Sequence, residues 1–186
     1  MKDPYGNLFS ALCWIFLDMK FFGLPDILPD FIGYMFFAYG IYLLPTSHQL
    51  KRWTKNFAIV LIVFSFFVEL DQWIGTELLG QIGVQLMQFL LILFMYFLFQ
   101  LLLHIHENKA LEAKTFKTYQ IYMGLMLCAF VIQAFSINVD VSMQDKVLTI
   151  SAILQVIAFL NFNFYCRSGT KYFKSKQQGN VQSQSL

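Results

Sequence analysis

The chain has 186 residues, of which 58% are hydrophobic and only 13% are charged, and its mean hydropathy is +0.57. This composition excludes a water-soluble globular protein, in which about 25% of residues are charged. The formal net charge of +2 is too small to indicate a nucleic-acid partner. We therefore expect an integral membrane protein whose main partner is the lipid bilayer.

Six apolar segments follow one another, each close to the roughly 20 residues that a helix needs to cross a membrane. Turn-forming residues separate the first four, as in Gly23-Leu24-Pro25, Pro45-Thr46-Ser47 and Gly75-Thr76. No small-x-small cleavage site follows the first segment, so we expect it to stay in the protein. The expected fold class is all-α, a polytopic membrane protein with six transmembrane helices in three hairpins. The segments are Tyr5–Phe22, Ile27–Leu44, Phe57–Ile74, Glu77–Leu103, Tyr119–Ile137 and Val147–Tyr165.

The domain division follows from the change in composition near residue 168. Residues 1–167 are expected to form the six-helix transmembrane domain, whereas residues 168–186 are rich in Gln and Ser and are expected to form a flexible cytoplasmic tail. A weak internal similarity is also present, because Phe16-Leu17-Asp18 matches Phe67-Val68-Glu69 at an offset of 51 residues. Either an ancestral repeat or chance matching of apolar residues explains it.

The basic residues predict the orientation in the membrane. With the N-terminus inside, eleven of the thirteen Lys and Arg residues fall in cytoplasmic stretches, and only Lys20 and Lys146 lie outside. Because cytoplasmic loops of membrane proteins are enriched in Lys and Arg, we expect a multi-pass protein of the cell membrane with both termini in the cytoplasm. Eight of the eleven acidic residues fall at the opposite, outer ends.

The most distinctive local pattern is the stretch Asp26-Ile27-Leu28-Pro29-Asp30-Phe31-Ile32-Gly33-Tyr34. It resembles the acidic hairpin between the first two helices of small multi-pass membrane proteins of Gram-positive bacteria. The resemblance covers about the first 45 residues and implies a bacterial plasma membrane and a helical hairpin, but no mechanism. Physically, Asp26 and Asp30 suit the positive end of the second helix dipole, and Gly33 and Gly40 share a face that permits close helix packing.

Two carboxylates are placed deeper than the rest, since Asp18 and Glu69 each lie about five residues inside the outer end of a predicted helix. A charge in the membrane needs a partner or a wet cavity. Lys20 is a possible partner, so both a structural role and a ligand or proton site stay open. On the fourth segment the amides form a polar stripe that either packs against another helix or lines a polar path. The candidate ion- or ligand-binding residues are Asp18, Lys20, Asp26, Asp30, Glu69, Asp71, Gln81, Gln85 and Gln88.

Other reactive residues give no site. His104 and His106 are two residues apart and point away from each other on a helix, so we interpret them as interfacial histidines and predict no metal site. The three cysteines lack metal-ligand spacing, and no catalytic motif is present. We therefore expect no cofactor and no enzymatic activity. The favoured function is an accessory, immunity-type or regulatory binding subunit that engages another membrane protein or itself, and the alternative is a small cation- or proton-coupled transporter or channel.

Overall fold

The structure, a computed structural model, describes residues 3–17, 30–75, 80–105 and 108–184. All regular elements in these ranges are helices, which confirms the predicted all-α class. They are α1 (Pro4–Leu17), α2 (Asp30–Leu43), α3 (Gln49–Ile74), α4 (Gly80–Ile105), α5 (Lys109–Phe135), the short 3-10 helix η2 (Ser136–Asn138) and α6 (Val141–Gln184).

Four helices contain stretches long and apolar enough to cross a membrane, and these are Gln49–Asp71, Gln85–Ile105, Lys109–Phe135 and Met143–Ser175. The described parts of α1 and α2 have 14 residues each, or about 21 Å at 1.5 Å per residue, which is shorter than a hydrocarbon core of about 30 Å. The predicted turn at Gly23-Leu24-Pro25 between them lies outside the described residues.

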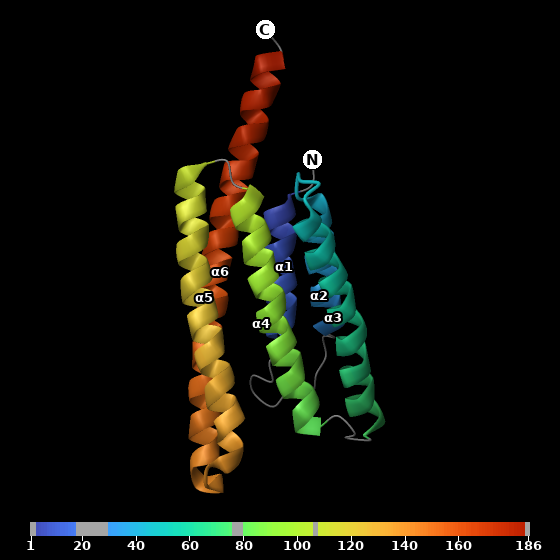
Figure 1. Cartoon of the computed structure of the whole chain (residues 1–186), viewed down its shortest axis with the longest axis vertical. Helices are drawn as coiled ribbons and strands as arrows, with labels where there is room; N and C mark the ends of the chain where they lie inside the picture. The colour runs from blue at the N-terminus through green and yellow to red at the C-terminus, as the bar shows by residue number, and fades with distance from the viewer. Residues whose placement is uncertain (1–2, 18–29, 76–79, 106–107, 185–186) are drawn as a thin grey trace.

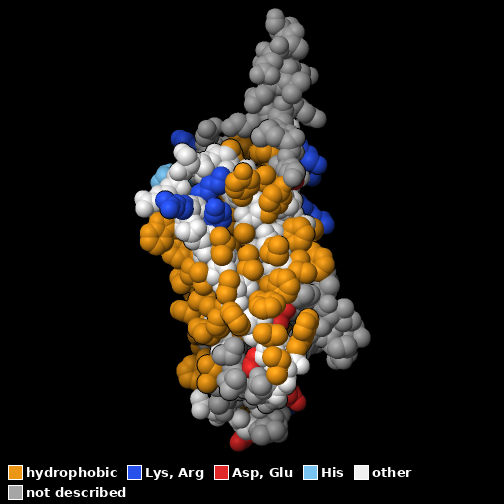
Figure 2. Space-filling view, turned by 90° about the vertical axis from the view of Figure 1, so that its right-hand side faces the viewer, with side chains coloured by type: hydrophobic (Ala, Val, Ile, Leu, Met, Phe, Trp, Pro, Cys, Tyr) orange, Lys and Arg blue, Asp and Glu red, His pale blue; other side chains and the backbone are white. Residues whose placement is uncertain are grey.

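The helices run alternately up and down, so that both chain ends lie at the same end of the bundle (Figure 1). Each helix packs against the next in the sequence, and α6 also packs against α1, which closes a ring of six. On the face that Figure 2 shows, the Lys and Arg side chains gather at the end that carries the termini, whereas the Asp and Glu side chains lie toward the other end, with apolar side chains between them. We call these two ends the basic end and the acidic end.

Local sequence explains where several helices begin and end. Asp3 caps α1 by accepting a hydrogen bond from the Tyr5 amide at 3.0 Å, and Asn108 caps α5 in the same way at 2.9 Å from the Ala110 amide. Gly75 follows α3 with a φ of +71°, a left-handed conformation that glycine adopts without strain. The predicted breaks at Pro45 and Gly75 are thus confirmed.

Three helices extend beyond the predicted apolar segments. α3 begins at Gln49 rather than Phe57, α5 begins at Lys109 rather than Tyr119, and α6 continues to Gln184 rather than Tyr165. All three extensions lie at the basic end (Figure 1). The apolar segments of the sequence mark only the part of each helix that faces lipid. Lys, Glu, Gln and Ala are good helix formers, so the helices continue past these segments.

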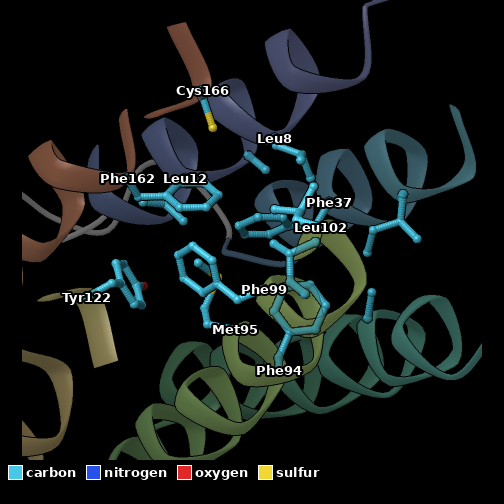
Figure 3. Packing of buried hydrophobic residues seen from close by; sticks show 14 of the residues in the cluster. Leu8, Leu12, Phe37, Phe94, Met95, Phe99, Leu102, Tyr122, Phe162 and Cys166 are labelled. Atoms are coloured by element: carbon cyan, nitrogen blue, oxygen red, sulfur yellow. The ribbon is translucent and has the colours of Figure 1, made fainter. Parts of the chain in front are cut away.

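Side chains of α4 fill the centre of the ring (Figure 3). The Phe94 ring lies 5.0 Å from the Phe37 ring of α2. The Phe99 ring lies 5.7 Å from Tyr122 of α5 and 5.5 Å from Phe162 of α6. All five residues are almost completely buried. Aromatic rings at these spacings attract one another beyond their hydrophobic burial, so α4 joins helices from both sides of the bundle.

Glycines bring α1 close to both of its neighbours. A Cβ atom at Gly33 would lie 2.9 Å from the Ala11 carbonyl oxygen, and one at Gly40 would lie 3.2 Å from the Pro4 carbonyl oxygen. The predicted role of these two glycines in close helix packing is therefore confirmed, and the helix that they approach is α1. On the other side, Gly169 of α6 is buried against Tyr5. Helix packing thus continues past residue 167, where the transmembrane domain was expected to end.

Candidate functional site at the acidic end

The described part of the chain contains five of the nine candidate binding residues with their side chains. These are Asp30 of α2, Glu69 and Asp71 of α3, and Gln85 and Gln88 of α4. Asp18, Lys20 and Asp26 lie outside the described residues, and so does the side chain of Gln81. The predicted pairing of Lys20 with Asp18 or Glu69 therefore stays a prediction.

Glu69 joins the end of α3 to the beginning of α2. Its Oε1 atom accepts a hydrogen bond from the Phe31 backbone amide at 3.3 Å and another from the Ser65 hydroxyl at 3.2 Å. Phe31 lies in the first turn of α2, where amide groups have no partner within their own helix and the helix dipole favours a negative charge. The Glu69 carboxylate therefore acts as a helix cap supplied by a neighbouring helix.

Apolar and polar contacts surround this cap. The Phe31 ring packs edge-on against Phe66 of α3 at 5.8 Å. Asp30 begins α2, which confirms the prediction that it lies in the first turn. One turn further along α2, Tyr34 is almost completely buried. The acidic end of the α2–α3 pair thus combines two carboxylates, a phenol and a hydroxyl.

The two described amides of the α4 stripe are buried on the core side of that helix. Gln85 lies seven residues before Ile92, and Gln88 lies seven before Met95, so each shares a helix face with a buried apolar residue. The Gln85 Nε2 atom and both polar atoms of Gln88 are buried and make no hydrogen bond with any residue that the structure describes. Such buried amides are costly unless water or another molecule satisfies them.

A third buried amide lies on the neighbouring helix. The Gln133 Oε1 atom of α5 is also buried without a described partner. The Phe89 ring of α4 lies 5.9 Å from the Phe130 ring of α5. Gln85 is one turn from Phe89 and Gln133 is one turn from Phe130, each toward the acidic end (Figure 1). The α4–α5 contact therefore brings polar groups from two helices to a similar height along the bundle.

The polar pair on α6 holds helices together. Ser151 donates a hydrogen bond to the Ala129 carbonyl oxygen of α5 at 3.0 Å, and Gln155 donates one to the Ser151 hydroxyl at 3.3 Å. Together the two side chains connect α6 to the α5 backbone. These two side chains therefore have a packing role.

At the basic end, His104 makes a contact that the sequence did not reveal. Its ring lies 4.0 Å from the ring of His48, which precedes α3, and both residues are exposed. Within the described ranges no three His, Cys, Asp or Glu residues are grouped closely enough to hold a metal ion. His106 and Glu107 lie outside these ranges.

Sequence reasoning selected Glu69 but missed Phe31 and Ser65 as its partners. Ser65 precedes Glu69 by four residues, a spacing at which helical side chains meet, so this partner was open to prediction. The Phe31 amide depends on how α2 packs on α3 and left no signal in the sequence. Comparison with known proteins adds no assignment, because no protein-family model, no curated protein and no solved structure matches this chain.

Proposed function

We propose that this chain is a non-enzymatic integral membrane protein that acts as an accessory, immunity-type or regulatory binding subunit. In this proposal all six helices cross the cell membrane of a bacterium as three hairpins, and both termini lie in the cytoplasm. The partner is another membrane protein or a second copy of the chain, bound within the membrane near the acidic end.

The observation that carries this proposal is that Glu69 caps a neighbouring helix. A carboxylate that carries protons or cations must exchange them, whereas Glu69 accepts hydrogen bonds from Phe31 and Ser65 and caps α2. Its geometry therefore favours a structural role. The apolar surface nearby is available for contact, since Trp73, Ile74 and Ile82 are 71%, 64% and 78% exposed. Within a membrane, such side chains contact either lipid or a partner helix, and in this proposal they contact the partner.

Photo-crosslinking in intact cells tests the proposal. A benzophenone amino acid replaces Trp73, at the acidic end of α3, or Trp53, which is 62% exposed at the basic end of the same helix. We expect a discrete protein adduct from position 73 and none from position 53. Adducts of equal yield at the two positions, or lipid adducts alone at position 73, would contradict a partner at the acidic end.

The alternative function, a small cation- or proton-coupled transporter, is favoured by one observation. The buried amide groups of Gln85, Gln88 and Gln133 have polar atoms without described partners, as expected for the lining of a polar path. Vesicles containing the purified protein and a pH-sensitive dye distinguish the two functions. Proton flux that requires Gln88 and exceeds that of protein-free vesicles would favour transport, whereas the binding-subunit proposal expects no such flux.

A further inference from the structure

A lysine and a serine connect α5 and α6 at the basic end. We call the line of contact between these two helices the α5–α6 seam. The Lys114 Nζ atom donates a hydrogen bond to the Ser168 hydroxyl oxygen at 2.5 Å. Ser168 in turn donates its own hydrogen to the Phe164 carbonyl oxygen at 3.0 Å. The hydroxyl therefore positions the ammonium group, which has three donors and uses one of them here. Lys114 is exposed, so its remaining donors are available to an anion.

Other cations extend this arrangement along the α5–α6 seam. Lys171 follows Ser168 by three residues and Lys117 follows Lys114 by three, so each lies on the same helix face one turn away. Both are exposed. Because α5 and α6 are antiparallel (Figure 1), the three lysines succeed one another at intervals of about one helical turn, or about 5 Å. No Asp or Glu occurs after Asp145, so no α6 carboxylate beyond that residue neutralises them.

The surface below these lysines is apolar on both helices. Phe164, Ile157 and Ile150 lie 7, 14 and 21 residues before Lys171 and are 63%, 46% and 52% exposed. On α5, Ile121 follows Lys114 by seven residues and is 40% exposed. A spacing of seven keeps residues on nearly the same helix face. The α5–α6 seam therefore has a cationic end and an apolar stripe that leads from it toward the acidic end.

We propose that the surface along the α5–α6 seam binds one anionic phospholipid from the leaflet at the basic end. The phosphate lies between Lys114 and Lys171, and an acyl chain lies along Phe164, Ile157, Ile150 and Ile121. Charge complementarity selects an anionic head group, and the apolar stripe selects a lipid rather than a soluble anion. Basic pockets between transmembrane helices on the cytoplasmic side are known to bind such head groups.

Lipid titration of the intact protein in a maltoside detergent tests this proposal. The probes are dioleoylphosphatidylglycerol and dioleoylphosphatidylcholine, and native mass spectrometry measures the bound lipid. Each cation near an anionic head group contributes about a factor of five in affinity. We expect Lys114→Gln with Lys171→Gln to weaken phosphatidylglycerol binding roughly thirtyfold and to leave phosphatidylcholine binding unchanged. The charge-conserving pair Lys114→Arg with Lys171→Arg should retain most of the affinity.

The matched control is Arg52→Gln with Lys109→Gln, which removes two exposed charges from the basic end but none from the three lysines of the α5–α6 seam. An equal loss of phosphatidylglycerol binding in this control would overturn the proposal, because the attraction would then be diffuse. Equal binding of the two lipids by the wild type would also overturn it. Competition by inorganic phosphate at the same concentration as lipid would assign the site to a soluble anion. If the double variant fails to fold, Lys171→Gln alone should lose roughly fivefold, and no loss would contradict the proposal.

Discussion

The aromatic ring of Tyr5 in α1 lies directly against Gly169 in α6, where a Cβ atom would be only 2.5 Å from the Tyr5 Cδ1 atom. Tyr5 also packs edge-on against Tyr165, with ring centroids 6.2 Å apart. The first and last helices of the chain are therefore held together at a point that has no room for an added methyl group.

Gly169→Ala should consequently destabilise the protein. Overpacking costs about 1–3 kcal/mol, which outweighs a gain of up to about 1 kcal/mol from replacing glycine within a helix. Gly124→Ala is the matched control, since nothing lies within 4 Å of a Cβ atom there, and it should raise stability slightly. Thermal unfolding in one detergent, followed by circular dichroism, measures both. A melting temperature for Gly169→Ala equal to or above that of the wild type would show that Tyr5 moves away without cost.

The contrast between glycines shows what the sequence was able to reveal. Gly33 and Gly40 are seven residues apart within one apolar segment, so their common face was predictable and is confirmed. Gly169 stands in a polar stretch that resembles a flexible tail, and its partner Tyr5 lies at the other end of the chain. Only the packing of α6 on α1 reveals their contact. Local spacing is encoded within a segment, whereas partners on distant helices depend on the tertiary arrangement.

The candidate site also combines features that one segment of sequence predicts with contacts that depend on the tertiary arrangement. The acidic character of the α2 start and the amide stripe of α4 follow from spacing along single helices, and both could be predicted. The hydrogen bond between the Phe31 amide and Glu69 joins two helices, and its donor is a backbone group that residue type does not reveal. The sequence therefore left both a structural role and a binding role open for Glu69, whereas the structure gives it a capping role.

The capping role of Glu69 predicts a specific pattern of stability losses. Glu69→Ala should lower the free energy of unfolding by about 1.5–3 kcal/mol, because hydrogen bonds to a charged group are lost. Ser65→Ala should lower it by about 0.5–1.5 kcal/mol, and Glu69→Gln should lose less than Glu69→Ala because it keeps the acceptor oxygen. Since both donors meet at one oxygen, the Ser65→Ala and Glu69→Ala double variant should be little worse than Glu69→Ala alone. Strictly additive losses would argue against the shared oxygen.

Two truncations separate the packed part of the C-terminal region from the rest. Removal of the residues after Lys176 should leave the melting temperature unchanged, as the Gln- and Ser-rich composition predicts. Removal of everything after Arg167 also deletes Gly169, which contacts Tyr5, and Phe173, which packs against the core. This shorter chain should melt at a clearly lower temperature. Equal melting temperatures for the two truncated chains would mean that the contacts of Gly169 and Phe173 contribute nothing measurable.

Reporter fusions test the proposed orientation. Fusions after Leu44, Leu103 and Tyr172 should report the cytoplasm, and fusions near Leu24, Gly75 and Val141 should report the exterior, because eleven of thirteen basic residues fall on the first side. The shared position of both chain termini at the basic end (Figure 1) is compatible with this expectation. An externally active reporter at Tyr172 would be incompatible with an even number of crossings.

The buried amides of α4 either have no hydrogen-bond partner in the working protein or bind water or a ligand. Gln88 buries both polar atoms without a described partner, whereas the Gln155 amide donates a hydrogen bond to Ser151. Methionine has a similar length and no strong hydrogen-bonding group. If Gln88 is unsatisfied in the working protein, Gln88→Met should raise the free energy of unfolding by up to about 1–3 kcal/mol. Gln155→Met should instead lower it by about 0.6 kcal/mol, the average strength of such bonds within membranes.

Denaturant-induced unfolding of both variants in the same detergent measures this difference, and the wild type provides the reference. Stabilisation by Gln88→Met together with unchanged crosslinking at position 73 would support the binding-subunit proposal, because the amide would then contribute nothing that the protein uses. Destabilisation by Gln88→Met would mean that water or a bound ligand satisfies the amide within the bundle. A cation or proton pathway requires a wet polar interior. That result would therefore favour the transporter over the binding subunit.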